Sequence, residues 1–245
     1  MEPVFRSLEI AGRAAVRVTG TRITFRGLEH IPSTGGAVVA INHTSYVDFL
    51  PAALAATARR RRMRFMIKAE MKEVRFVNFL ITRAGTIPVD RQSGAESYPV
   101  AVRQLRAGEL VGVYPEATIS RSFELKEFKS GAARMAWEAQ VPIIPLIVWG
   151  MHRIWTKDHP KVLGRNNIPV TVQAGPALTA GPDTGHTMIE LRTAMTTLLH
   201  RVQDDYPHPA GAHWVPRRLG GAAPTPDEAR LLDEAEAARR RAGRA

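Results

Sequence analysis

The sequence contains no cysteine among its 245 residues. Disulfide bonds, thiolate zinc sites and a cysteine nucleophile are therefore excluded, and the composition fits a reducing compartment. Long hydrophobic runs are missing as well. The longest candidate, "VPIIPLIVWG" at 141–150, contains two prolines. It is about half as long as a membrane span, so we predict a buried strand and no membrane crossing.

Signals for export and for several common enzyme classes are also absent. The N-terminus has no continuous apolar segment before a cleavage site, so we expect no signal peptide. The motifs G-x-S-x-G, G-x-x-x-x-G-K-[ST], G-x-G-x-x-G and H-E-x-x-H do not occur. His152 and His159 have no obvious third ligand nearby, so we predict no metal site.

Positive charge is what the chain has in excess. Lys and Arg number 34 against 23 Asp and Glu, which gives a net charge of +11. This excess predicts an anionic partner, which is nucleic acid, an anionic lipid surface or a phosphorylated small molecule. Hydrophobic residues make up 44% of the chain, enough for a sizeable core.

Residues 1–20 are predicted to form an amphipathic helix. Arg6, Arg13 and Arg17 lie on one face of a helical wheel, opposite an apolar face made of Val4, Phe5, Leu8, Ala11, Ala15, Val16 and Val18. Two interpretations are open at this point. The helix lies in a membrane interface with its arginines among the headgroups, or it packs on the domain with its arginines in solvent.

Strand and helix patterns alternate along the rest of the chain. Strands are predicted at 21–31, 35–42, 63–71, 86–91, 110–118, 141–149 and 170–178. Helices are predicted to begin near Val47 or Asp48 and to cover 73–85, 97–108, 128–140 and 186–203. This alternation predicts one α/β domain at 21–206, with a mostly parallel central sheet flanked by helices. The tail at 207–245 ends in a short helix with Thr225 and Glu228 in capping-box positions.

The stretch "INHTSYVDFL" at 41–50 places His43 five residues before Asp48. On an ideal helix the two side chains would diverge by about 140°, so they can meet only where a turn enters a helix. There the carboxylate would fix the imidazole tautomer and leave the other ring nitrogen to act as a general base. Ser45 adds a hydroxyl between them. The same spacing also occurs by chance.

Three more strand or helix ends carry polar residues. Arg91 ends "GTIPVDR", Glu116 follows the strand in "VYPEATISR", and Lys129 begins a helix in "EFKSGAA". In a parallel sheet such strand ends gather at one carboxyl edge, where α/β proteins bind ligands. Each residue also has an ordinary alternative, which is a surface ion pair for Arg91, a turn for Glu116 and solvation for Lys129.

Taken in order, these stretches resemble the glycerolipid acyltransferases of the 1-acylglycerol-3-phosphate acyltransferase (PlsC-like) family. The family's N-H-x-x-x-x-D block looks like Asn42, His43 and Asp48. Its later blocks look like residues 85–91, "YPEATIS" at 114–120, and "VPIIPLIV" at 141–148. Lysines are common in the family at the positions of Lys68 and Lys129. The resemblance covers residues 25–180 approximately.

The resemblance implies transfer of a fatty acyl group from acyl-CoA to a hydroxyl of a glycerol-phosphate lipid, with His43 and Asp48 as catalytic residues. It implies 1-acylglycerol-3-phosphate as the acceptor and phosphatidic acid as the product, in phospholipid biosynthesis. Glycerol-3-phosphate, another lysophospholipid or a glycolipid are alternative acceptors. No cofactor is implied, since acyl-CoA is a co-substrate. The candidate substrate-binding residues are Asn42, Ser45, Lys68, Arg91, Glu116, Arg121 and Lys129, with Glu116 either contacting acceptor hydroxyls or ordering the basic residues.

Two positions depart from the family's third block, usually F-P-E-G-T-R-S. Ala117 stands at the usual glycine and Ile119 at the usual arginine, which the resemblance would assign to the substrate phosphate. A cation is therefore lost from the expected acceptor site. Either Arg121, two positions later, replaces it or the acceptor differs.

An amphiphilic substrate and the absence of a span together predict a peripheral (monotopic) enzyme on the cytoplasmic face of a membrane, bound to an anionic surface. Two other classes of protein are alternatives. The run "RRRRMR" at 59–64 would fit a nucleic-acid-binding protein, but it lacks interleaved aromatic residues, so no nucleic-acid partner is predicted. A non-catalytic membrane protein would not need both His43 and Asp48.

Overall fold

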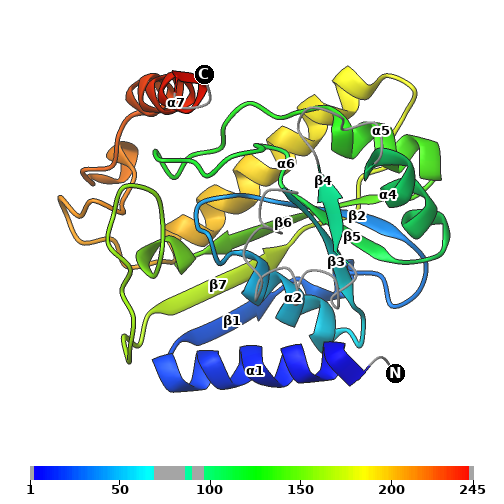
Figure 1. The fold of residues 1–245 in the computed structure, drawn as a ribbon, viewed down its shortest axis with the longest axis horizontal. Helices are drawn as coiled ribbons and strands as arrows, with labels where there is room; N and C mark the ends of the chain where they lie inside the picture. The colour runs from blue at the N-terminus through cyan, green and yellow to red at the C-terminus, as the bar shows by residue number, and fades with distance from the viewer. Residues whose placement is uncertain (1–2, 69–85, 90–96, 243–245) are drawn as a thin grey trace.

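The computed structural model describes residues 3–68, 86–89 and 97–242. Its centre is a seven-stranded sheet in the order β1-β7-β6-β2-β5-β3-β4 (Figure 1). The strands are β1 (Arg22–Arg26), β2 (Ala37–Ile41), β3 (Met63–Lys68), β4 (Ile87–Val89), β5 (Leu110–Val113), β6 (Ile143–Trp149) and β7 (Pro169–Ala174). All neighbours pair in parallel except β6 and β7, which are antiparallel. The predicted mostly parallel sheet is confirmed.

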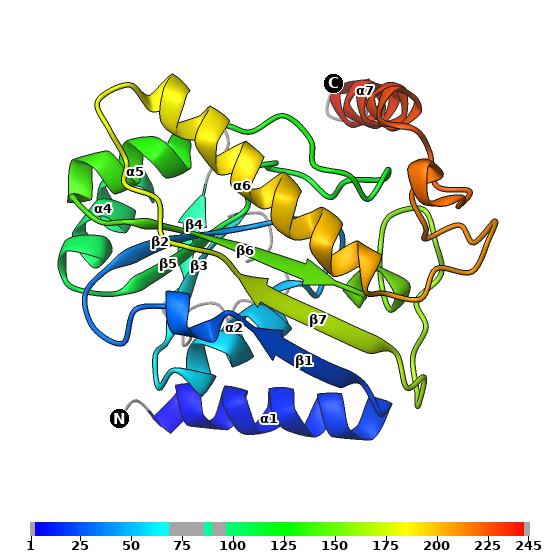
Figure 2. The same ribbon diagram turned by 180° about the vertical axis from the view of Figure 1, so that it is seen from behind.

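Helices cover both faces of this sheet, as Figures 1 and 2 show from opposite sides. One face carries α4 (Ser97–Arg106), α5 (Gly131–Ala139) and α6 (Thr184–Asp204), and the other carries α2 (Phe49–Ala58). Alternate residues of β2 enter the two cores, Val38 on the α4–α6 side and Val39 on the α2 side. Because both faces are covered, β2 and β6 are apolar at every position.

The order of the central strands positions the site. β2 pairs in parallel with β5 on one side and with β6 on the other. Their carboxyl ends therefore lie at one edge of the sheet, where the chain continues into residues 42–48, 114–130 and 150–168. This is the edge at which the sequence predicts the polar residues. The helix expected at 73–85 lies outside the described residues.

The N-terminal helix, α1 (Pro3–Thr19), lies along α2 at the bottom of Figure 1. A Cβ on Gly12 would lie only 2.7 Å from Cδ1 of Leu50, so glycine allows this close approach. On another side of α1, Ile10 and Val18 remain 60% and 72% exposed. The helix therefore packs on the domain along one side and presents apolar residues to solvent along another. None of the described helices is long and apolar enough to cross a membrane.

The arginine run at 59–64 fixes the loops around α2. The guanidinium of Arg59 donates to the carbonyl oxygen of Ile31 at 3.3 Å. Arg61 donates at 2.6–2.8 Å to three carbonyl oxygens, those of Pro32, Gly35 and Gly108. These two side chains of the run therefore hold the loops next to α2 in place.

The chain ends in α7 (Pro226–Ala242), which lies apart from the sheet in both ribbon views. The predicted capping box is present. The N–H of Glu228 donates to Oγ1 of Thr225 at 3.2 Å, and the N–H of Thr225 donates to Oε2 of Glu228 at 2.8 Å. α7 therefore begins with its first backbone donors satisfied by its own residues.

Candidate active site

The turn between β2 and α2 brings His43 and Asp48 together. Oδ2 of Asp48 accepts hydrogen bonds from the backbone N–H groups of Thr44 and Ser45, at 2.8 and 2.7 Å. The same oxygen lies 3.4 Å from Nδ1 of His43. Because α2 begins only at Phe49, the intervening residues do not follow helical geometry and the two side chains can meet. Nε2 is then the ring nitrogen left to face a substrate.

Burial dominates the electrostatics of this pair. Asp48 is fully buried, whereas the side chain of His43 is 19% exposed. Burial raises the pKa of Asp48 above 3.8, although the imidazole and the two N–H donors act to lower it. The carboxylate is therefore costly to ionise by itself and gains from a positive charge on His43.

Two residues at the end of β5 hold His43 in place. The ring of Tyr114 stacks on the imidazole with centroids 4.2 Å apart. Oε1 of Glu116 accepts the backbone N–H of His43 at 2.8 Å, and Oε2 accepts the N–H of Lys126 at 3.0 Å. Burial raises the pKa of Glu116 to about 7, against the opposing effect of these donors. Glu116 thus holds the backbone at His43 and Lys126, and its contact with acceptor hydroxyls stays a prediction.

The loop after β5 contains two strained positions. Ala117 and Phe123 have φ angles of 59° and 58°, in the left-handed region that L-residues seldom occupy. The hydrogen bonds of Glu116 and a bond from Ser120 N–H to the carbonyl oxygen of His43, at 2.8 Å, fix the loop in this shape. Backbone strain is thus kept beside His43 by the contacts around it.

Asn42 and Ser45 were expected to bind substrate, and in this structure their side chains hold the backbone around the site. Nδ2 of Asn42 donates to the carbonyl oxygen of Val148 at 3.1 Å, and Oδ1 accepts the N–H of the same residue at 2.7 Å. The hydroxyl of Ser45 donates to the carbonyl oxygen of Trp155 at 2.6 Å. Both side chains are fully buried. Asn42 thus joins the end of β2 to β6, and Ser45 joins the turn to the loop after β6.

Three more cations, Lys68, Arg91 and Lys129, were expected to bind substrate, and the structure describes the positions of two of them. Lys68 is the last residue of β3, next to β5 in the sheet. Lys129 is exposed, and its N–H donates to the carbonyl oxygen of Pro115 at 2.9 Å, two residues before α5 begins. Arg91 lies outside the described residues. Lys68 and Lys129 thus belong to the same edge of the sheet as His43.

Arg121 is occupied by acidic side chains in this conformation. Its side chain is 7% exposed, and its guanidinium pairs with Asp158 at 2.5 Å, with Glu236 at 2.9 Å and with Asp233. Lys126 and Lys157 join the same carboxylates of α7. The sequence did not single out these two lysines. No motif marks them, because they lie on separate loops and converge only in the fold.

His152 and His159, for which the sequence predicts no metal site, pack against other aromatic rings. His152 is buried and lies against Trp149 and Phe123, with ring centroids 4.3 and 4.7 Å away. His159 stacks on His213 at 4.2 Å. Within residues 3–68, 86–89 and 97–242, no group of three or more His, Cys, Asp or Glu side chains is arranged to hold a metal ion.

Comparison with known proteins finds acyltransferases by family model and by sequence similarity. The model of the acyltransferase family matches residues 22–149. The chain is 28% identical over 123 residues to a 1-acyl-sn-glycerol-3-phosphate acyltransferase of Bacillus subtilis, a match covering 50% of this chain and 60% of that one. Against 1-acyl-sn-glycerol-3-phosphate acyltransferase alpha of Mus musculus it is 28% identical over 193 residues, 76% of this chain and 66% of the other. The matches thus span about 60% of the length of such relatives.

A solved structure shows the same fold. The crystal structure of PlsC, the 1-acyl-sn-glycerophosphate (LPA) acyltransferase from Thermotoga maritima, matches this chain with a TM-score of 0.70. The match covers 83% of this chain and 81% of that one at 19% sequence identity. At this identity the likeness extends to the architecture of the sheet and its helices.

Proposed function

Because the chain belongs to the acyltransferase family, we propose that it transfers a fatty acyl group from acyl-CoA to a hydroxyl of a glycerol-phosphate lipid. The observation that carries this proposal is the contact of His43 with the buried Asp48 at the carboxyl edge of the sheet. Relatives titled 1-acyl-sn-glycerol-3-phosphate acyltransferase make 1-acylglycerol-3-phosphate the first acceptor to test, with phosphatidic acid as its product.

The pair supplies one general base, and the chemistry needs no protein nucleophile. Nε2 of His43 takes the proton of the acceptor hydroxyl as its oxygen attacks the thioester carbonyl. The C–O ester bond forms, the C–S bond breaks, and the CoA thiolate receives the proton from the imidazolium. Since a thiol has a pKa of about 8.5, it leaves without a second acid. Asp48 stabilises the imidazolium between these two proton transfers, as in a catalytic triad.

The surroundings of His43 suit this role. The stack on Tyr114 and the bond from its own N–H to Glu116 fix the ring and the backbone independently. Burial, and then the charge of Asp48, raise the pKa of Tyr114 well above 10, so the phenol stays neutral beside the reacting centre. A fixed imidazole reduces the entropy lost on reaching the transition state.

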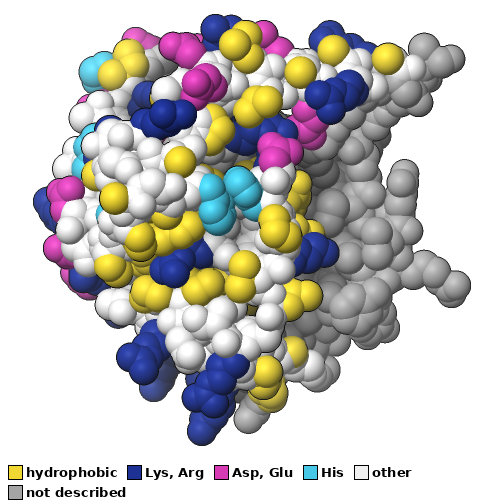
Figure 3. Space-filling view, turned by 90° about the vertical axis from the view of Figure 1, so that its left-hand side faces the viewer, with side chains coloured by type: hydrophobic (Ala, Val, Ile, Leu, Met, Phe, Trp, Pro, Cys, Tyr) yellow, Lys and Arg dark blue, Asp and Glu magenta, His cyan; other side chains and the backbone are white. Residues whose placement is uncertain are grey.

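We further propose that the enzyme works on an anionic membrane surface, on the cytoplasmic face, where anionic lipids attract a chain of net charge +11. The loop at 154–168 lies against the end of α1, because the N–H of Asn166 donates to the carbonyl oxygen of Thr19 at 2.9 Å. Large apolar residues are exposed on both segments, namely Ile10, Val18, Val162 and Leu163. Figure 3, which views the side on which this loop lies, shows hydrophobic and basic side chains interspersed. Such a mixture fits the boundary between headgroups and acyl chains.

Replacing His43 by alanine tests the proposed reaction. Labelled acyl-CoA is offered with 1-acylglycerol-3-phosphate, glycerol-3-phosphate and other lysophospholipids, and the lipid product is identified. Loss of the base should slow transfer about 10²–10⁴-fold. His186→Ala is the matched control, since His186 is 68% exposed on α6. A folded His43→Ala protein with wild-type turnover, or a wild-type protein that acylates none of these acceptors, would overturn the proposal.

A further inference from the structure

Three cations converge next to the turn that carries His43. Arg121 and Lys126 belong to the loop after β5, and Lys157 belongs to the loop after β6. Each loop is bonded to the turn. The N–H of Ser120 donates to the carbonyl oxygen of His43 at 2.8 Å, and the hydroxyl of Thr156 donates to that of Thr44 at 2.7 Å. The backbone next to Arg121 and Lys157 is therefore bonded directly to the turn that carries His43.

Two carboxylates of α7 occupy this cluster. Asp233 pairs with Lys126, with Nη1 of Arg121, and with Nζ of Lys157 at 3.3 Å. Glu236 pairs with Nη2 of Arg121 and with Nζ of Lys157, both at 2.9 Å. The terminal nitrogens of the guanidinium, which form the fork suited to phosphate, are thus taken by α7. Nε pairs instead with Asp158.

Charge holds α7 on the domain more than apolar contact does. Ala229 is the buried side chain on the described part of α7, and it shares one face with Asp233 and Glu236 at i, i+4 and i+7. Leu231 and Leu232 remain 58% and 45% exposed. A helix attached in this way loses little apolar burial when an anion displaces its carboxylates. Its capping box also belongs to the helix itself and is kept on release.

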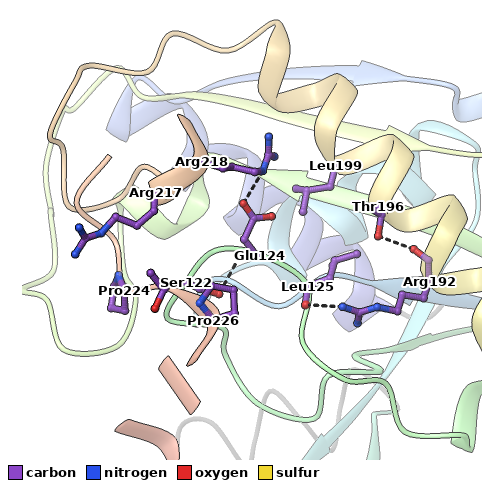
Figure 4. A pocket seen from close by; sticks show the side chains of 11 residues that line it. Ser122, Glu124, Leu125, Arg192, Thr196, Leu199, Arg217, Arg218, Pro224 and Pro226 are labelled. Atoms are coloured by element: carbon purple, nitrogen blue, oxygen red, sulfur yellow. Dashed lines mark hydrogen bonds and ion pairs between the residues drawn. The ribbon is translucent and has the colours of Figure 1, made fainter. Parts of the chain in front are cut away.

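The loop that carries the cations is fixed without α7. Arg218 pairs with Glu124 at 2.7 Å, and Arg192 on α6 donates to the carbonyl oxygen of Leu125 at 3.1 Å (Figure 4). These residues line a cavity of about 450 Å³ between α6 and the start of α7, with Pro224 and Pro226 at its wall. The backbone that carries Arg121 and Lys126 should therefore keep its place when α7 moves, and the cavity leaves room at the point where the helix is attached.

We propose that Arg121, Lys126 and Lys157 form the binding site for the phosphate monoester of the acceptor, and that Asp233 and Glu236 hold this site closed as substitutes for it. Two carboxylates carry the charge of about −2 that a phosphate monoester has at neutral pH. The hydroxyl of Thr118 accepts a hydrogen bond from Nζ of Lys126 at 2.6 Å, which leaves its own proton to be donated to an anion. The identity of the anion rests on the function proposed above. α7 is then an autoinhibitory helix that the phosphorylated acceptor must displace.

The test removes the two substitute charges and measures binding without an acyl donor. Asp233→Asn/Glu236→Gln is titrated calorimetrically with a soluble short-chain 1-acylglycerol-3-phosphate and with the corresponding monoacylglycerol. Asp227→Asn/Glu234→Gln is the matched control, because both residues are exposed on α7 and pair with Arg230 instead. Because α7 pairs with the cations in this structure, the first variant should bind the phosphorylated lipid about tenfold or more tightly than the wild type. The control should not change.

Three results would overturn the proposal. They are unchanged or weaker binding of the phosphorylated lipid by Asp233→Asn/Glu236→Gln, an equal gain for monoacylglycerol, or a gain that survives an added Lys157→Gln. If the variants fold poorly, hydrogen exchange on the wild-type protein tests the same displacement of α7 without any substitution. Saturating 1-acylglycerol-3-phosphate should speed exchange in 226–242, whereas monoacylglycerol should not, and an unchanged rate would refute displacement. Neither measurement needs turnover. A failure of the proposed acyl transfer, which the His43→Ala assay detects, is therefore distinguishable from a failure of the proposed phosphate site.

Discussion

Replacing Asp48 by asparagine removes the negative charge of this residue but keeps an oxygen that can accept the hydrogen bonds of the turn. The amide oxygen of asparagine can still accept the N–H groups of Thr44 and Ser45, which lie 2.8 and 2.7 Å from Oδ2 in the native turn. Burial already raises the pKa of Asp48, so removing its charge also removes an electrostatic cost. We therefore expect the free energy of unfolding to change by about 1 kcal/mol or less.

The effect on catalysis should be much larger. Oδ2 lies 3.4 Å from Nδ1 of His43, and at an effective dielectric constant near 20 a pair of unit charges at this distance interacts by about 5 kcal/mol. That energy corresponds to about 3.5 powers of ten in rate. Water at the 19%-exposed His43 side chain and the remaining amide dipole weaken the effect. We expect kcat to fall about 10²–10⁴-fold, as for other loss of general-base catalysis.

The assay measures kcat and KM for acyl transfer together with urea unfolding of the same preparations. Asp205→Asn is the matched control, because it removes the same charge from an exposed residue that pairs with Arg26. The expected signature is a large fall in kcat with little change in stability, and neither effect in the control. Asp48→Asn protein that is folded and keeps kcat within about threefold of the wild type would refute the imidazolium-stabilising role.

Three further predictions follow from individual residues. Ala117→Gly should raise the free energy of unfolding by about 1 kcal/mol, because glycine relieves the φ of 59°; urea unfolding that shows a loss would contradict the strain. Glu116 has a folded-state pKa of about 7, above 4.5, so its stabilising effect is full below pH 4.5 and is lost as pH rises through 7. Glu116→Gln should remove that part of the slope of Tm against pH, and an unchanged slope would argue against the raised pKa. Val18→Asp and Leu163→Asp should weaken sedimentation with anionic vesicles while Ile189→Asp, at a residue 67% exposed on α6, should not; equal effects would place the contact elsewhere.

The fold was predictable wherever local signals determine it. Apolar strands buried on both faces and the helices between them set the order of the described elements. Most boundaries fell within a few residues, but the strands expected at 21–31 and 110–118 end at Arg26 and Val113. Pro51 fits the first turn of a helix, which placed the start of α2 at Asp48 or just before it, and the helix begins at Phe49. The capping box of α7 is equally local, because Thr225 and Glu228 satisfy each other.

The roles of polar residues near the site were less predictable, because they depend on neighbours from other strands. Asn42 and Ser45 lie in the same short stretch as His43, and spacing alone cannot distinguish a ligand from a framework residue. Their partners, Val148 and Trp155, are at least 106 residues away in the sequence. Packing of β6, and of the loop that follows it, against this stretch buries both side chains.

Position 119, where the family usually has an arginine, shows most clearly that sequence alone cannot predict contacts between distant residues. Ile119 is 3% exposed and packs into the interior, so the cation expected there is lost from the structure as well as from the motif. Arg121 and Lys126 on the same loop, with Lys157 from another, bring three positive charges beside the turn of His43 instead. The sequence showed the loss, and it offered Arg121 as a replacement. It could not show the convergence, because Nη1 of Arg121 reaches Asp233 across 112 residues, and no local pattern links a tail helix to a strand end.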